Sequence, residues 1–284
     1  DSKTTDFKRL IMKENFLTVM ASSSFRRYQQ SSEVLSENDL LESIKKMEAI
    51  EPIVLSKTDF HFITEIKKKS PSMGPLSEKS FDIKAQAEQY TKGGASLISV
   101  LTEPTQFSGS LEDLNAIAQM RLDTPLMRKD FLIHPYQVSE ARYYGAHGVL
   151  LIVGMLNDDQ LEKMILRCLE HKMFVILEVF NQLELERANN RIKKTDGVID
   201  SLLLGVNCRN LKSLTVDFAN FEKLANDLPK NTICVAESGI YGSNDIKKVI
   251  KMGYRSALIG TSLMQSADPQ ATLQKMKAAA SKSI

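Results

Sequence analysis

Short apolar runs recur along the chain and alternate with longer segments in which apolar residues stand three or four positions apart. Runs rich in Val, Ile and Leu are typical of buried strands, whereas the wider spacing is typical of amphipathic helices. The eight runs span residues 61–67, 96–103, 125–131, 148–153, 174–180, 201–207, 232–238 and 256–262. The pattern therefore predicts eight strand–helix units in succession.

End signals support the predicted helices. The segments DIKAQAEQYTKGG (82–94) and YQVSEARYYGA (136–146) finish at glycine, which is favoured just beyond a helix C-terminus. The segment NDDQLEKMILRCLEH (157–171) begins with Asn and Asp, which favour a helix N-terminus, and continues with an apolar stripe.

Strict alternation of strands and helices predicts a parallel sheet. The strands begin about 23 to 35 residues apart, which fits a (β/α)8 TIM barrel. A doubly wound sheet also alternates, but eight units without a Gly-x-Gly turn after the first strand favour the barrel. We therefore expect an α/β protein whose catalytic barrel covers residues 61–284.

Residues 1–60 precede the barrel and are expected to form a helical extension. Ser36, followed by Asp39, predicts the start of a helix over 36–50. Its apolar face would consist of Leu40, Leu41, Ile44, Met47 and Ile50. A second helix is expected over 7–21, with a loop or a weakly formed helix over 22–33. We expect the extension to pack across one end of the barrel, although an oligomer interface would bury its apolar face equally well.

Composition and charge narrow the classes of protein. The 284 residues are 43% hydrophobic and 25% charged, as in an ordinary globular protein, with a formal net charge of +2. No basic tract points to nucleic acid, and no apolar run is long enough to span a bilayer. We therefore expect neither nucleic acid nor a membrane as a partner, and a cytoplasmic location.

Residues that hold metals and cofactors do not occur in familiar arrangements. Cys168, Cys208 and Cys234 are widely spaced and form no C-x-x-C pair, which suits a reducing compartment and indicates no disulfide. The four histidines lack ligand spacing, and neither a dinucleotide fingerprint nor a Walker loop occurs. The sequence therefore predicts no metal and no cofactor.

The C-terminal ends of the strands build the active site in barrels of this kind, so polar residues there are candidates. Glu65 and Lys67 stand two apart in the first strand and share a face. In the third strand Lys129 and Phe131 share one face, whereas Arg128 and Asp130 lie on the other. Glu178 interrupts the apolar fifth strand.

At the end of the sixth strand the segment NCRN (207–210) places Asn207 and Arg209 on a common face. Taken singly, charges at strand ends are usually solvated or paired, so no one of them indicates a site by itself. Glu178 is the exception, because an unpaired carboxylate among Val, Ile, Leu and Phe is costly. A neighbouring lysine would relieve that cost and tune both groups for proton transfer.

Glycine turns follow the last two strands, at Ser238-Gly239 and Gly260-Thr261. Glycine lets the backbone approach an anion closely, and barrels commonly bind phosphate at these two strand ends. Ordinary tight turns are the alternative. The presence of both turns favours a phosphate site.

The ordered motifs EIKKKSPSMGPL (65–76), RKDF (128–131), GVNCRNL (205–211), AESGI (236–240) and LIGTSLM (258–264) resemble the indole-3-glycerol-phosphate synthase family. The resemblance runs from about Phe60 to about Leu273. It implies a carbon–carbon carboxy-lyase of tryptophan biosynthesis. Its substrate would be 1-(2-carboxyphenylamino)-1-deoxyribulose 5-phosphate, converted to indole-3-glycerol phosphate with loss of CO2 and water, without cofactor or metal.

The resemblance also implies roles for residues. Lys129 would be the general acid, Lys67 would bind the anthranilate carboxylate, and Glu178 and Glu65 would be acid/base groups. Asn207 and Arg209 would orient the substrate. The residues at or near the phosphate would be Ser70, Ser238, Gly239, Gly260 and Thr261. The residues forming the aromatic pocket would be Pro71, Phe107, Phe131, Leu150 and Leu211. Cys208, between Asn207 and Arg209, should face away from the pocket.

Two other functions fit the same fold. One is a paralogous barrel acting on a related anthranilate or sugar phosphate, which would show altered pocket residues beside intact phosphate turns. The other is a non-catalytic barrel, which predicts loss of at least one of Lys129, Glu178 and Glu65, whereas all three are present. Both a monomer and a homo-oligomer are compatible with the sequence.

Overall fold

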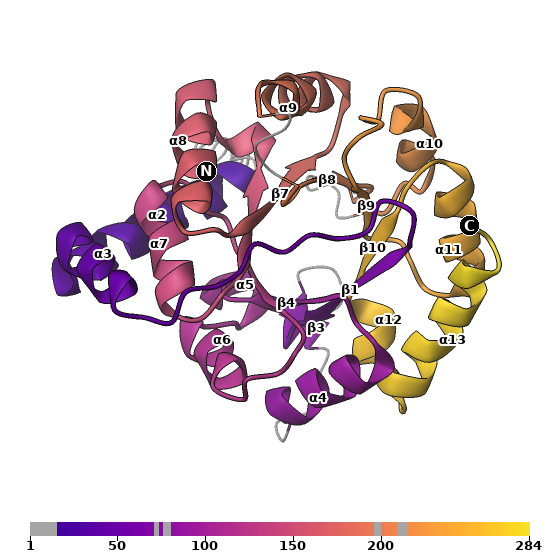
Figure 1. Cartoon of the computed structure of the whole chain (residues 1–284), viewed down its shortest axis with the longest axis horizontal. Coiled ribbons are helices and arrows are strands. Elements are labelled where there is room, and N and C mark those ends of the chain that lie inside the picture. Colours follow the sequence, from indigo (N-terminus) through magenta and orange to yellow (C-terminus); the bar gives the residue numbers. More distant parts are fainter. Residues whose placement is uncertain (1–15, 71–73, 76–80, 196–199, 210–214) are drawn as a thin grey trace, which may run out of the picture.

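Eight parallel strands close into a barrel in this computed structural model, which describes residues 16–70, 74–75, 81–195, 200–209 and 215–284 (Figure 1). The strands are β1 (His61–Ile66), β4 (Leu97–Leu101), β5 (Leu126–Lys129), β6 (Gly148–Ile152), β7 (Phe174–Val179), β8 (Leu202–Asn207), β9 (Cys234–Glu237) and β10 (Ser256–Ile259). Each strand pairs with its successor, and β10 pairs back onto β1 with Leu258 opposite Ile63. The predicted (β/α)8 barrel is confirmed.

Helices surround the barrel and return the chain to the start of each next strand. The main ones are α4 (Ile83–Gly93), α6 (Leu111–Ala118), α7 (Pro135–Tyr143), α8 (Asp158–Glu170), α9 (Gln182–Lys194), α10 (Ala219–Ala225), α11 (Ser243–Lys251) and α13 (Pro269–Ser281). The helix ends predicted from the sequence are found: Gly94 ends α4 with a left-handed φ of 84°, and Asn157 forms a capping box at the start of α8.

Shorter elements follow the C-terminal ends of several strands. They are the hairpin β2 (Lys69–Ser70) and β3 (Gly74–Pro75), the helices α5 (Pro104–Phe107) and α12 (Thr261–Met264), and the 3-10 turn η1 (Val153–Met155). None of these was predicted from the hydrophobic pattern, because segments of two to four residues are too short to show a period.

Alternation along each strand separates two packed layers. In β7, Val175, Leu177 and Val179 pack outward against the helices, whereas Phe174 and Ile176 pack inside the barrel. Glu178 continues this inward column at the C-terminal end of the strand. The same alternation places Lys129 above Met127 in β5. The apolar interior is therefore topped by polar side chains.

The N-terminal extension is more helical than expected. Helix α2 runs from Phe16 to Val34, so the polar segment 22–33 is part of a regular helix and not a loop. Residues 7–15 of the first expected helix lie outside the described residues. Helix α3 (Glu37–Lys45) starts at the predicted cap Ser36 but ends early, so that Met47 and Ile50 lie beyond it.

The extension covers both ends of the barrel interior. At the C-terminal end Met20 of α2 joins the inner apolar cluster, and α2 contacts α7 and η1. Between α3 and β1 the chain crosses the opposite end, where Ile53 and Leu55 pack on the same cluster (Figure 1). There the hydroxyl of Ser201 donates to the carbonyl of Ile53 at 3.0 Å. None of the described helices is long and apolar enough to cross a membrane.

Gly148 is required by the interior of the barrel, because a Cβ atom there would overlap the ring of Phe174 on the neighbouring strand. We expect Gly148→Ala to lower the free energy of unfolding by about 1 to 3 kcal/mol through overpacking. Urea denaturation of the parent, Gly148→Ala, Phe174→Leu and the double variant measures this cost. It should shrink in the Phe174→Leu background, where the ring is absent; an equal cost in both backgrounds contradicts the account.

Candidate active site

A cavity opens at the C-terminal ends of the strands, with a volume of about 880 Å³ including its open mouth. All eight barrel strands contribute to its lining. Their contributing residues are Glu65, Leu101, Lys129, Leu150, Ile152, Glu178, Asn207, Glu237 and Leu258. A cavity of this size suits a small molecule.

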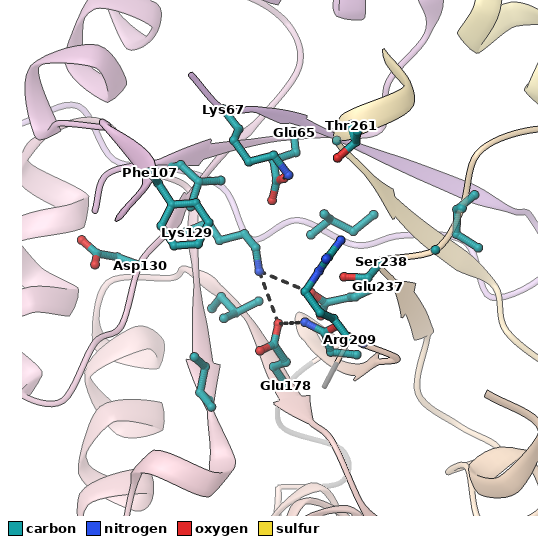
Figure 2. A pocket seen from close by; sticks show the side chains of 18 of the residues that line it. Glu65, Lys67, Phe107, Lys129, Asp130, Glu178, Arg209, Glu237, Ser238 and Thr261 are labelled. Atoms are coloured by element: carbon teal, nitrogen blue, oxygen red, sulfur yellow. Dashed lines mark hydrogen bonds and ion pairs between the residues drawn. The ribbon is translucent and has the colours of Figure 1, made fainter. Parts of the chain in front are cut away.

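The ammonium group of Lys129 lies at the centre of the cavity, between two carboxylates (Figure 2). Its Nζ is 3.3 Å from Oε2 of Glu178 and 3.4 Å from Oε2 of Glu237. Burial works against a charged lysine, but the carboxylates of Glu178, Glu237 and Glu65 outweigh it and raise the pKa of Lys129. Lys129 therefore carries its proton at neutral pH.

Glu237 was missed by the sequence analysis, although it lines the cavity and contacts Lys129. It stands in the apolar strand β9, and the signal that singled out Glu178 in β7 would have found it there. Burial, followed by the negative charge of Glu178, raises the pKa of Glu237 well above its ordinary value, although Lys129 opposes this. Glu237 therefore keeps its proton to a higher pH than an ordinary glutamate does.

Glu65 and Lys67 form a second buried pair in the cavity, with Nζ of Lys67 2.6 Å from Oε1 of Glu65. Burial opposes ionisation of Glu65, but the ammonium groups of Lys67 and Lys129 outweigh it and lower the pKa of Glu65. The pair lies beside Gly260, where a Cβ atom would overlap Oε1 of Glu65 and lie 3.0 Å from Nζ of Lys67. Gly260 therefore leaves the space that this pair occupies.

Asn207 connects the end of β8 to the carboxylates. Its Nδ2 donates to Oε2 of Glu178 at 3.2 Å, and its Oδ1 accepts from the backbone amide of Arg209 at 2.9 Å. Asn207 and Arg209 both line the cavity. Cys208 between them is buried in the outer layer against the helices, on the face away from the cavity as expected.

One wall of the cavity is aromatic. Phe131 lies 5.8 Å from the ring of Phe16 and 6.1 Å from that of Phe107, measured between ring centroids. Leu150 adds an aliphatic surface to the same cavity. Phe16 was not predicted, because it belongs to the extension and nothing in the local sequence marks it as part of the site. The rings of Phe16 and Phe107 are inclined to that of Phe131 by 74° and 36°, so the wall offers both ring faces and ring edges to an aromatic ligand.

The two glycine turns lie together on the cavity lining, at Ser238-Gly239 and Gly260-Thr261. Ser238 and Gly239 both have left-handed backbones, with φ of 68° and 70°, so the chain turns sharply after β9. Gly260 precedes the first turn of α12, whose leading amides have no partner within the helix. This arrangement offers backbone donors to an anion.

Three predicted residues are not brought into the described lining. Pro71 and Leu211 lie outside the described residues. Ser70 is described and buried in β2, but it is absent from the described residues that line the cavity. Within the same described ranges no group of three or more His, Cys, Asp or Glu residues has the arrangement of a metal site.

The arrangement can donate and accept protons next to a bound aromatic anion. It combines a protonated lysine, carboxyl groups with pKa values shifted in opposite directions, and an apolar wall. Separated pKa values of this kind are a feature of acid/base sites.

Replacing Glu237 by Gln tests whether its carboxyl group stays protonated in the folded protein. The folded chain keeps a proton that the unfolded chain releases above the ordinary pKa of 4.5. Relative to Glu237→Gln, the parent should lose about 1.4 kcal/mol of unfolding free energy per pH unit as pH rises above this value, until Glu237 ionises in the folded state. Urea denaturation between about pH 5 and pH 8 measures the difference. Parallel pH curves for the two proteins would contradict it.

Comparison with known proteins identifies the family. The indole-3-glycerol phosphate synthase family matches residues 20–276 of this chain. A relative of that name from Nocardioides sp. is 41% identical over 214 residues, which cover 75% of this chain and 78% of the relative. Another from Paenarthrobacter aurescens is 39% identical over 228 residues, which cover 80% of each protein.

Solved structures of other enzymes share the fold. The 3-hexulose-6-phosphate synthase from Salmonella typhimurium has a TM-score of 0.62 at 12% identity, covering 79% of this chain and 100% of that chain. The phosphoribosylanthranilate isomerase from Thermotoga maritima has a TM-score of 0.55 at 12% identity, covering 78% and 99%. Identities this low show the fold alone, whereas the family match spans nearly the whole barrel, all of α3 and most of α2. The chain therefore belongs to the indole-3-glycerol phosphate synthase family.

Proposed function

We propose that this chain converts 1-(2-carboxyphenylamino)-1-deoxyribulose 5-phosphate into indole-3-glycerol phosphate in tryptophan biosynthesis. The reaction joins the aromatic ring to the ribulose carbonyl carbon and releases CO2 and water, so the enzyme is a carbon–carbon carboxy-lyase. Relatives named indole-3-glycerol phosphate synthase support this activity. The observation that carries the proposal is a lysine ammonium between two buried carboxylates, beside an aromatic wall.

Ring closure places negative charge on the carbonyl oxygen, and this oxygen must be protonated. The raised pKa of Lys129 supplies an ammonium that is charged before the substrate arrives. A preorganised positive charge at a developing oxyanion stabilises the transition state. Lys129 is therefore the general acid of ring closure in this proposal.

Loss of CO2 and of water follows ring closure. Departure of CO2 restores the aromatic ring, and departure of the hydroxyl as water needs an acid for the oxygen and a base for a ring proton. Glu178, Glu65 and Glu237 lie around the ammonium of Lys129 and are the groups available for these transfers. Asn207 holds Glu178 in place through its amide.

The two anionic groups of the substrate need separate partners. The ammonium of Lys67 lies beside Gly260 and would pair with the anthranilate carboxylate of the bound substrate. Arg209 provides a second cationic side chain on the lining. The turns at Ser238-Gly239 and Gly260-Thr261 would receive the phosphate through backbone amides.

The proposed partner of this site is thus a small phosphorylated molecule, and we propose the cytoplasm as its compartment. The three cysteines are unpaired and buried, which suits a reducing environment.

Replacing Lys129 by Met removes the ammonium but keeps an apolar side chain of similar length. We expect kcat to fall about 10²- to 10⁴-fold, because the carbonyl oxygen loses its acid. Formation of the indole product, followed by its fluorescence, measures the rate. Lys92→Met, on the exposed face of α4, is the matched control and should keep the parental rate. Parental activity in Lys129→Met would exclude Lys129 as the acid.

Gly260→Ala tests the space left for the Glu65–Lys67 pair. The added methyl group displaces both side chains, and we expect kcat/KM to fall about 10- to 100-fold, with little loss of stability because only flexible chain ends must move. Steady-state kinetics and a thermal melt measure the two effects. Gly242→Ala is the control, since no atom lies within 4 Å of a Cβ atom there. Equal kinetics for both variants would show that the position of the pair does not matter.

A further inference from the structure

Asp130 directly follows the last residue of β5, but its carboxylate points away from the centre of the cavity and is fully buried (Figure 2). The guanidinium of Arg27 donates to both of its oxygens at 2.8 Å, and the hydroxyl of Thr102 donates at 2.7 Å. Arg128 donates at 3.2 Å and the backbone amide of Phe131 at 2.8 Å. Five donors saturate the two oxygens. We call the side chains of Asp130, Arg27, Thr102 and Arg128 the outer cluster.

The outer cluster joins the three segments that supply the rings of the aromatic wall. Arg27 belongs to α2, which begins with Phe16. Thr102 precedes Glu103, whose carboxylate caps α5 by accepting from three backbone amides, including that of Phe107. The third ring, Phe131, has its own amide bound within the cluster.

Arg27 lies on the face of α2 that meets the barrel. Phe16, Met20, Ser24 and Arg27 follow one another at intervals of four, four and three residues, which places them on one side of a helix. Met20 and Ser24 are buried, and the side chain of Arg27 is 21% exposed. Arg27 therefore ties α2, which begins with Phe16, to the segment directly after β5, the strand that bears Lys129.

Other bonds hold α2 on α7 without Arg27, and they lie on both sides of Arg27 along the helix. The amide of Gln137 donates to the hydroxyl of Ser24 at 2.9 Å. The hydroxyl of Tyr136 donates to the carbonyls of Ser31 and Leu35, at 3.0 and 2.8 Å. Loss of Arg27 should consequently leave α2 docked on α7 but remove two of the five donors to Asp130, which binds the amide of Phe131, so that the aromatic wall loosens there.

We infer that Arg27 is a positioning residue of this active site: by binding both oxygens of Asp130 through its two terminal nitrogens, Nη1 and Nη2, it fixes the aromatic wall that receives the benzene ring of the substrate. The inference rests on the proposed function, which supplies that ring. A bidentate arginine–carboxylate pair sets orientation as well as distance, so a lysine should replace it only in part.

The test compares two ligands on Arg27→Met by calorimetry. One is the proposed substrate with its keto group reduced to an alcohol, which keeps the benzene ring; the other is glycerol 3-phosphate, which has no ring. The reduced compound should bind about tenfold more weakly to the variant, the scale of one lost aromatic contact. Glycerol 3-phosphate should bind as it does to the parent. Arg26→Met, at the exposed neighbouring position, is the matched control and should change neither.

Two further variants keep the test decisive if Arg27→Met folds poorly. Arg27→Lys and Thr102→Val each remove part of the bonding to Asp130, and both should weaken the reduced compound by less than tenfold while sparing glycerol 3-phosphate. Equal weakening of both ligands would indicate a merely structural role and overturn the inference, as would unchanged binding in every variant. A parent that forms no indole-3-glycerol phosphate refutes the proposed function instead.

Discussion

A lysine ammonium can stay charged inside a barrel only if negative charge lies close to it, and this requirement organises the centre of the molecule. Lys129 stands at the end of β5, and its partners Glu178 and Glu237 stand at the ends of β7 and β9. A charged carboxylate at Glu178 would be costly to bury without the ammonium, whereas Glu237 avoids part of that cost because its raised pKa lets it keep its proton. The three groups are far apart in sequence, and the closed barrel brings them together.

Alternation along the strands then divides the charges between two faces. Lys129 points into the cavity, whereas Arg128 on the preceding position points outward and binds Glu140 of α7 at 2.8 Å. Burial would favour a neutral Asp130, but Arg128 and Arg27 keep its pKa below the usual range. The segment at the end of β5 thus presents the ammonium of Lys129 to the cavity, whereas the charged groups of Arg128 and Asp130 are hydrogen-bonded to their neighbours on the other face.

Much of this was predictable from the sequence, and the exceptions have physical causes. The eight strands and the cap residue Ser36 followed from local patterns, because period and capping are properties of neighbouring residues. The alternation rule also predicted that Glu65 and Lys67 share a face, and both side chains line the cavity. Glu237, like Glu178, is a single carboxylate in an otherwise apolar strand, and it was overlooked.

Contacts between distant segments could not be predicted in the same way. Phe16 joins the aromatic wall only because α2 is held against the barrel by bonds such as Arg27–Asp130, more than a hundred residues apart in sequence. The polar composition of residues 22–33 concealed a helix whose barrel-facing positions are few. Helix α3 ends at Lys45, but the apolar spacing in the sequence continues to Met47 and Ile50, so the predicted helix was too long.

The central claim is that the paired carboxylates keep Lys129 charged. Carbon-13 labelling of the lysine side chains, with Lys129→Met to assign the resonance, follows its titration directly by nuclear magnetic resonance. The account predicts that the Lys129 signal remains that of an ammonium group through the range in which the exposed lysines titrate, near pH 10.4, and that it shifts toward the ordinary value in a Glu178→Gln variant. A Lys129 that loses its proton together with the exposed lysines, or before them, would contradict it.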